Sequence, residues 1–195
     1  SFQLGRYPAT YMAGIPIEVQ PSIATRMVVP LAVIDHAAKG FAQIVEKAGL
    51  QKKIASFAKS LSEYKIGNYE TSIVLAWFLT ESAINQLWEQ HLNSINHDLG
   101  ADRKRINSKR RKFLTGRDFT ASIISNLLEL CEILPHSLFD DIDEVRGFRN
   151  NIVHGNGVTV GAKESALALK TALTMIDRIW NFRFTPNMSY TIAGL

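Results

Sequence analysis

The sequence predicts an all-α fold: a helical bundle of five to six helices with an irregular N-terminal arm. Apolar residues recur three and four positions apart along most of the 195-residue chain, which is the period of an amphipathic helix. Glycine or proline separates most periodic stretches, and we find no convincing strand pattern. The 46% apolar and 21% charged residues are typical of a folded globular protein, and the length suits one domain.

The chain is expected to open with an irregular arm over residues 1–24, which is rich in Gly, Pro and Tyr. A single helical domain follows over residues 25–184, and residues 185–195 form a C-terminal tail. The first two helices are predicted to end before Gly49 and Gly67, where their periodic patterns stop. Their apolar stripes are Leu31, Ile34, Ala38, Phe41 and Val45, and then Leu50, Ile54, Phe57, Leu61 and Tyr64.

The longest helix is predicted over about residues 69–96. Its first half is apolar nearly all round, which predicts a central helix that other elements contact on several sides. The next helix stops before Pro135, and its apolar stripe places Cys131 in the core. Thr115 or Asp118 is the expected N-terminal cap of this helix.

Two further helices complete the predicted bundle. One begins at Ser137 and ends near Gly155, and the other starts at Ala162 and has an apolar stripe that continues to Trp180. The segment "GNGVTVG", residues 155–161, connects them.

The composition excludes several kinds of site. A single cysteine excludes an internal disulfide and a thiolate zinc site, and it makes a reducing, cytoplasmic location the expectation. The longest strongly apolar run, residues 71–80, is far shorter than the ~20 residues of a membrane-spanning helix, so no membrane partner is expected. His91 and His97 do not share a helical face, so we predict neither a metal nor a cofactor.

A basic segment follows the long helix. Residues 102–112, "DRKRINSKRRK", contain seven lysines and arginines and one aspartate, although the whole chain has a net charge of only +4. Such a local field attracts phosphate backbones through counterion release. A solvated surface and a transport signal are the alternatives.

The stretch "RGFRNNIVHG", residues 146–155, places a cation on the apolar side of a helix. At ~100° per residue, Leu138, Ile142 and Val145 mark an apolar stripe, and Arg149 falls in its middle. The acidic residues of the same helix fall on the opposite side. Because arginine keeps its charge, its burial is costly unless an anion and well-placed acceptors compensate.

Two anions are candidates to pair with Arg149. One is Glu81, which falls on the apolar side of the long helix, and the other is a phosphate that a ligand brings. Asn150 and His154 are one helical turn apart and share a face, and Gly155 marks the helix end. Arg149 and His154 are about 140° apart around the axis, which would let them grip a ligand from two sides.

A purely structural interpretation explains the same residues. Arg149 would pair with Glu81 to lock the bundle. Asn150 would then be a surface residue, and His154 would cap the last carbonyl groups of its helix. Both interpretations direct the Arg149 side chain away from solvent.

The stretch "RNNIVHG" resembles the motif of the HEPN superfamily of small all-α domains, in which a polar residue follows an arginine and a histidine stands near a helix end. The order of elements is similar as well: a long apolar helix with an acidic residue ("FLTESAINQLW"), a further helix ("FTASIISNLLELCEIL"), the motif helix and a closing helix. The resemblance covers about residues 69–184, which would form a HEPN-like core, and leaves residues 1–68 unexplained.

The resemblance implies a function. Members of this superfamily typically dimerise so that two motifs line one cleft, and many are metal-independent endoribonucleases of toxin–antitoxin, antiphage or RNA-processing systems. RNA, a homodimer and an antitoxin or defence-complex partner are thereby implied. Other members only bind RNA, nucleotides or partner proteins, which is the alternative. A third interpretation is a protein-binding bundle whose basic segment meets an acidic partner.

By position, the resemblance assigns catalytic roles to three residues: Arg149 for phosphate and transition-state charge, Asn150 for orientation, and His154 for proton transfer. Histidine and arginine suit attack of the RNA 2′-hydroxyl on its own phosphodiester, which leaves a 2′,3′-cyclic phosphate. A two-fold dimer would supply a second histidine. The residues expected to bind the RNA backbone are Arg103, Lys104, Arg105, Lys109, Arg110, Arg111, Lys112 and Arg146.

Overall fold

The computed structural model describes residues 31–100, 103–155, 159–184 and 186. Within these ranges the chain forms seven α-helices and no named strand, which confirms the all-α prediction. The predicted arm over residues 1–24 and most of the C-terminal tail lie outside the described residues. Two compact units divide the chain, Ser1–Ala42 and Gln43–Leu195. The single helical domain over residues 25–184 stays a prediction.

The described part of the first unit is most of one helix, α4 (Leu31–Glu46). Its predicted stripe is exposed at Leu31, Ile34 and Phe41. The second unit contains the other helices: α5 (Leu50–Lys65), α6 (Tyr69–Ser94), α7 (Ser108–Leu114), α8 (Ala121–Leu130), α9 (His136–His154) and α10 (Ala162–Trp180).

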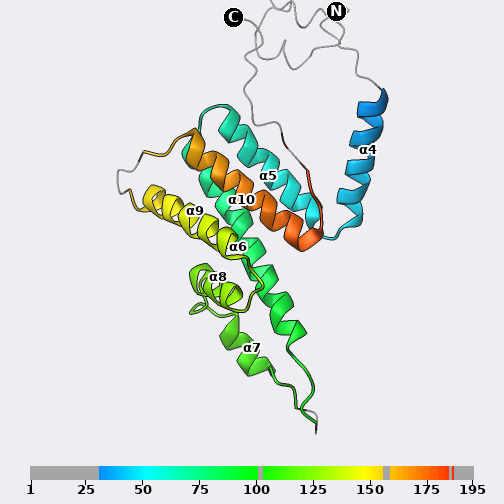
Figure 1. Ribbon diagram of the computed structural model, residues 1–195, viewed down its shortest axis with the longest axis vertical. Coiled ribbons are helices and arrows are strands. Elements are labelled where there is room, and N and C mark those ends of the chain that lie inside the picture. The colour runs from blue at the N-terminus through cyan, green and yellow to red at the C-terminus, as the bar shows by residue number, and fades with distance from the viewer. Residues whose placement is uncertain (1–30, 101–102, 156–158, 185, 187–195) are drawn as a thin grey trace, which may run out of the picture. The chain divides into compact units, whose positions relative to one another are not determined.

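Helix α6 is the central element of the second unit. Helices α5 and α10 pack along it, α9 packs on both α6 and α10, and α8 packs on α6 and α9 (Figure 1). The sequence predicts the central position of α6, because its first half is apolar nearly all round. Its buried residues are Ser72, Ile73, Ala76, Trp77, Leu79, Thr80, Ala83, Ile84, Leu87, Trp88 and Leu92.

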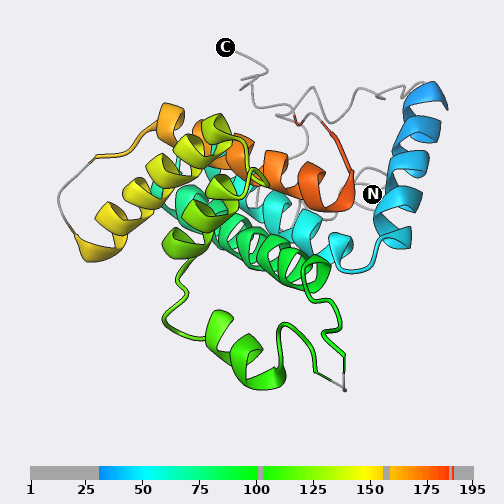
Figure 2. The same cartoon turned by 60° about the horizontal axis from the view of Figure 1, so that its bottom comes forward.

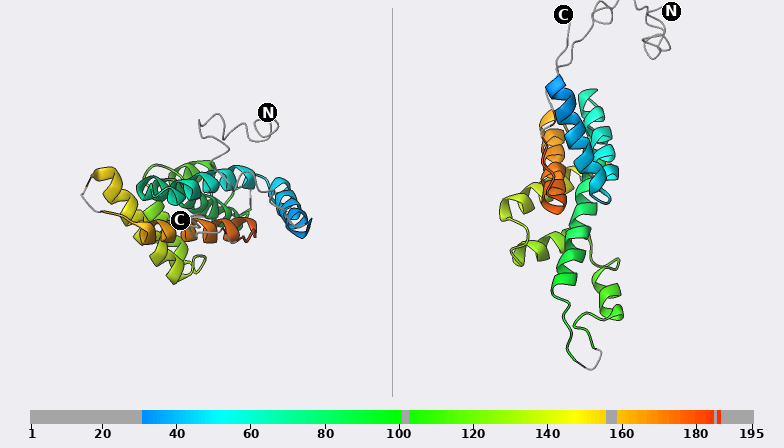
Figure 3. Two further views of the ribbon diagram at one scale, coloured as in Figure 1. Left: turned by 90° about the horizontal axis from the view of Figure 1, so that it is seen from above. Right: turned by 90° about the vertical axis from the view of Figure 1, so that its right-hand side faces the viewer.

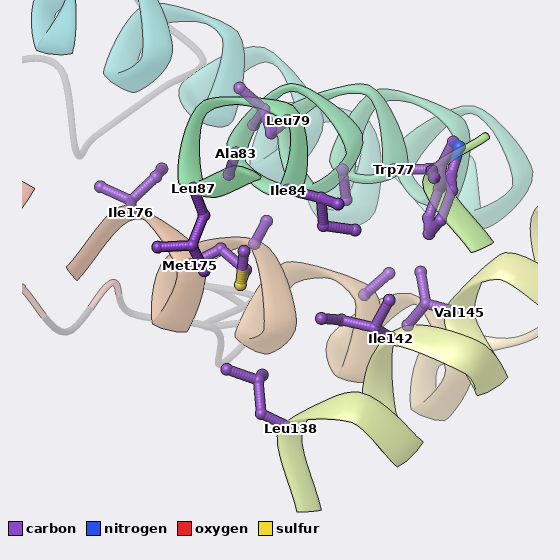
Figure 4. Packing of buried hydrophobic residues seen from close by; sticks show 14 of the residues in the cluster. Trp77, Leu79, Ala83, Ile84, Leu87, Leu138, Ile142, Val145, Met175 and Ile176 are labelled. Atoms are coloured by element: carbon purple, nitrogen blue, oxygen red, sulfur yellow. The ribbon is translucent and has the colours of Figure 1, made fainter. Parts of the chain in front are cut away.

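The core lies where α6, α9 and α10 meet (Figure 4). Ile84 of α6, Ile142 of α9 and Met175 of α10 are at most 1% exposed. Each large apolar side chain buried in this way contributes about 1.5–3 kcal/mol to folding. The α5–α6 contact includes a buried hydrogen bond, in which the Ser60 hydroxyl donates to the carbonyl of Ser72 at 2.8 Å.

Helix α8 is shorter than the sequence predicts. Its N-terminal cap is Thr120, whose hydroxyl accepts from the Ile123 N–H at 3.4 Å, and not Thr115 or Asp118. The helix ends at Leu130 because the chain turns through a positive φ of 56° at Glu132. Cys131 at this turn is therefore exposed, and its predicted place in the core is wrong.

Helix α7 is an additional element inside the basic segment, beyond the five to six helices predicted. It lies toward the C-terminal end of α6, which extends past α5 and α10 (Figure 3, right), and Figure 2 shows it apart from the other helices of the unit. The Trp88 indole N–H of α6 donates to the carbonyl of Leu114 at 2.8 Å and thereby fixes the end of α7. None of the described helices combines the length and apolarity needed to cross a membrane.

Candidate functional site

The end of helix α9 positions the motif. Gly155 follows the last helical residue, His154, with a φ of 65°, in the left-handed region that ends many helices and favours glycine. This confirms the predicted helix end. His154 is exposed there, while Arg149 and Asn150 are half-buried one turn and more before it.

Arg149 lines a pocket of about 310 Å³ at the junction of three helices. Helix α9 contributes the two arginines and the amide, α6 contributes an aromatic ring and a carboxylate, and the start of α8 forms the remaining wall. The lining residues are Trp77, Glu81, Thr120, Ala121, Ser122, Arg146, Arg149 and Asn150.

The Arg149 guanidinium has more donors than the protein satisfies. One Nη1–H donates to Oδ1 of Asn150 at 3.1 Å. The Nε atom is enclosed, yet it has no hydrogen-bond partner in the part of the chain that the structure describes. A buried donor without an acceptor costs about 1–3 kcal/mol, and more when it is charged. The guanidinium is therefore under-satisfied by the described residues, and the Arg149 side chain lines a pocket that a ligand can enter.

Glu81 and Arg149 share this pocket but do not pair directly. Across the described ranges, no carboxylate oxygen lies within 4.0 Å of an Arg149 nitrogen. The two side chains emerge from different helices and line the same open volume instead of closing it. The internal ion pair that the sequence offered as one candidate is thus not formed among the described residues, although Glu81 and Arg149 line the same pocket.

The start of α8 adds a favourable field for an anion. The first N–H groups of a helix have no acceptor within that helix, and its N-terminus carries about half a positive charge. Ala121 and Ser122, the first two residues of α8, line the pocket. The Arg146 guanidinium lines it too, although its Nε already donates to Oδ1 of Asp143 at 3.1 Å.

His154 does not line the pocket in a single chain. It follows Asn150 by four residues, which places it ~40° around the axis and ~6 Å further along α9. The fold therefore brings Arg146, Arg149 and Asn150 together with Glu81, and leaves the imidazole at the exposed helix end.

The basic segment forms a separate surface at the end of α6. Arg111 is partly neutralised, because its Nη1 lies 2.6 Å from Oε2 of Glu89 and its Nη2 also contacts Asn93. It lines another pocket, of about 550 Å³, together with Lys104. The remaining basic residues of the segment are exposed: Arg103, Arg105, Lys109, Arg110 and Lys112.

Four wall residues were not found from the sequence. Trp77 was assigned to the core, where it lies with 3% of its surface exposed, and its contact with the pocket depends on how α8 and α9 pack against it. Thr120, Ala121 and Ser122 had one usable signal, a threonine directly before the apolar run "ASIISNLLEL". That signal marks a helix start but gives no indication that it faces α9.

Comparisons of the chain with protein-family models, with curated proteins and with solved structures give no significant match.

Proposed function

We propose that this protein is a metal-independent endoribonuclease that holds the scissile phosphodiester of RNA in the Arg149 pocket. The observation that carries the proposal is the Arg149 side chain, which pairs with no carboxylate among the described residues and lines a pocket that the start of α8 also lines. A phosphodiester supplies both the acceptor atoms and the negative charge that these donors favour. The resemblance of residues 149–155 to the HEPN motif supports the same assignment.

The proposed reaction uses the nucleophile that RNA itself carries. The 2′-hydroxyl loses its proton and attacks the adjacent phosphorus, and the 5′-oxygen leaves with a proton. Arg149 stabilises the charge that develops on the phosphorus oxygens. Asn150 holds the guanidinium in place through the 3.1 Å hydrogen bond. His154 transfers a proton. The products carry a 2′,3′-cyclic phosphate and a 5′-hydroxyl, and DNA is not cut.

A homodimer completes the proposed site. His154 lies outside the pocket of its own chain, so a second copy that faces α9 would bring an imidazole toward Arg149. Val153 lies one turn beyond Arg149, and 53% of its surface is exposed, although valine is usually buried. An exposed apolar residue at this position supports the proposal that another subunit covers this surface of α9.

The basic segment would bind the RNA backbone on either side of the cut, and this binding weakens steeply as the salt concentration rises. Arg146 would act within the Arg149 pocket instead, since that is the pocket it lines. A role as a toxin or antiphage defence protein, restrained by an antitoxin or defence-complex partner, is part of this proposal.

The decisive experiment measures cleavage of a mixed RNA pool in EDTA. His154→Ala is expected to lower the cleavage rate at least ~100-fold, because general acid–base catalysis contributes about that factor or more. Thermal unfolding and the size of the assembly should not change, because His154 is exposed at a helix end. His97→Ala removes another exposed histidine and is the matched control. Undiminished cleavage by His154→Ala would exclude the proposed catalytic role.

The second candidate function is a non-catalytic HEPN-like module that binds RNA, a nucleotide or a partner protein. It is favoured by one observation: the imidazole and the guanidinium do not line the same pocket of one chain. A stable monomer by light scattering, together with an RNA gel shift at low salt and no cleavage, would favour this candidate.

A further inference from the structure

A second pocket, of about 300 Å³, adjoins the Arg149 pocket along α6. Glu81 lines the Arg149 pocket, and Asn85, one turn further along α6, lines the second. One turn corresponds to ~6 Å along the axis. The chain links the two pockets again at the start of α8, because Phe119 lines the second pocket and Thr120 lines the first.

The second pocket has an aromatic wall, and we call it the aromatic pocket. Trp88 and Phe119 both line it, with ring centroids 6.2 Å apart and planes at 17°. The Trp88 indole is fixed by its 2.8 Å hydrogen bond to Leu114, and the Phe119 ring is held edge-on by Phe113 at 5.4 Å. Trp88 is 6% exposed and Phe119 is half-buried, so the Phe119 ring is the part of this rigid wall that a flat base can reach and stack on at small entropic cost.

The rim of the aromatic pocket is polar and suits a base and its backbone. Asn85 offers both a donor and an acceptor, and Arg117 offers a cation. Neither side chain is hydrogen-bonded to another residue within the described part of the chain. Glu89 would repel a phosphate, but its carboxylate lies 2.6 Å from the Arg111 guanidinium, which offsets its charge.

We infer that the aromatic pocket binds a nucleobase of the same RNA strand whose phosphate occupies the Arg149 pocket. This inference rests on the proposed function and specifies its substrate class: an unpaired, single-stranded segment. In an A-form duplex the bases are paired and stacked on their neighbours, so none can turn onto the aromatic wall. Loops, bulges and ends leave a base free to enter.

The test measures binding of a short single-stranded RNA by fluorescence anisotropy, with 2′-O-methyl groups that block cleavage. Phe119→Leu removes the ring and keeps an apolar side chain, and we expect it to weaken binding by about 5- to 100-fold. Phe119→Tyr keeps a ring and should bind like the unchanged protein. Phe78→Leu is the matched control, because Phe78 is 54% exposed on α6 and lines neither pocket.

An abasic scan identifies the base that enters the pocket. Removing one base at a time should reveal one position at which binding falls by the same factor as in Phe119→Leu. At that position the missing base and Phe119→Leu together should weaken binding no more than either change alone, because both remove the same stacking contact. If Phe119→Leu fails to fold, Asn85→Ala serves instead, since Asn85 is exposed, and its loss should depend on that same base.

The inference is overturned by a Phe119→Leu variant that binds every oligonucleotide like the unchanged protein. It is also overturned by a scan in which the effects of the variant and of the missing base add at every position. A duplex of the same sequence should bind equally to both proteins, and a loss confined to the duplex would also count against the inference. These outcomes differ from a failure of the proposed function, which is undiminished cleavage by His154→Ala. If His154→Ala loses cleavage but Phe119→Leu binds RNA normally, the aromatic-pocket inference is wrong and the proposed nuclease function still stands.

Discussion

At the scale of single residues, Arg149 separates a structural from a functional explanation of the motif. A cation that locks a bundle needs a protein carboxylate, and within the described residues Arg149 has none within 4.0 Å. Its Nε is enclosed without an acceptor, so the folded state bears a cost at this position. Because Arg149 lowers the stability of the folded state and forms no ion pair, a role in ligand binding explains it better than a structural role.

Arg149→Met tests this interpretation because methionine fills a similar volume without the charge. We expect the free energy of unfolding to stay constant or to rise by about 1–2 kcal/mol, since replacing a poorly compensated internal charge by an apolar group is often stabilising. Binding of uncleavable RNA should fall at the same time. Chemical denaturation and anisotropy measure the two effects.

The opposite stability result would support the structural role. Loss of a buried pair costs about 3–5 kcal/mol, so a decrease of that size in Arg149→Met would mean that the arginine locks the bundle. Ile142→Ala provides the comparison, because Ile142 is 1% exposed and lies in the core. It should cost about 2–5 kcal/mol and leave RNA binding by the folded fraction unchanged.

Part of this site could be predicted from the sequence. The inward direction of Arg149 follows from counting ~100° per residue along one helix, and the end of α9 follows from Gly155. The opposite walls could not be predicted in this way. Trp77 and Ser122 reach the pocket only because α6 and α8 pack against α9, and the pattern within each helix does not fix that packing.

At the scale of elements, the long periodic helices were predictable and the short ones were not. Helix α10 has a strong apolar period and begins after Gly161, so its bounds agree with the sequence. Helix α7 has no buried residue of its own and depends on distant contacts, including that between Arg111 and Glu89. The end of α8 is set by a positive φ at Glu132, a residue type that gives no warning of such a turn.

The N-terminus of α10 gives the protein a local pH dependence. The Glu164 carboxylate accepts from the Gly161 N–H at 2.8 Å. Hydrogen bonds from the backbone of Glu164 itself, and then of Gly161, hold the pKa of this carboxyl below its ordinary value. Because the folded-state pKa is the lower one, the stabilisation is present above the unfolded-state pKa and is lost as the pH falls through the folded-state pKa.

Glu164→Gln should therefore lower the thermal stability at neutral pH, where the carboxylate is charged, and have little effect once the carboxyl is protonated in both states. The comparison is a series of melting curves from pH 7 down to ~3 for both proteins. Glu144→Gln removes an exposed carboxylate from the middle of α9 and is the control. A difference between Glu164→Gln and the unchanged protein that does not shrink as the pH falls would contradict the assigned cause.

At the scale of the whole molecule, the proposed activity depends on two copies. Arg149 and Asn150 line a pocket that His154 of the same chain does not, so a two-fold dimer would pair the guanidinium of one copy with the imidazole of the other. This arrangement makes a prediction that a monomeric enzyme does not share. Two variants that are each inactive should restore activity when their subunits exchange.

Arg149→Ala and His154→Ala protomers are therefore expected to be inactive separately and to recover activity when mixed. If the imidazole comes from the second copy, one of the two sites in each mixed dimer has lost both groups and the other keeps both. Random exchange makes half of the dimers mixed, and each has one intact site, so cleavage in EDTA should approach about a quarter of the unchanged rate. Crosslinking the two subunits within each variant's own dimer before mixing prevents exchange and should abolish the recovery. If exchange is demonstrated by mass and no cleavage returns, the guanidinium and the imidazole do not act across the interface, and the shared-site dimer is excluded.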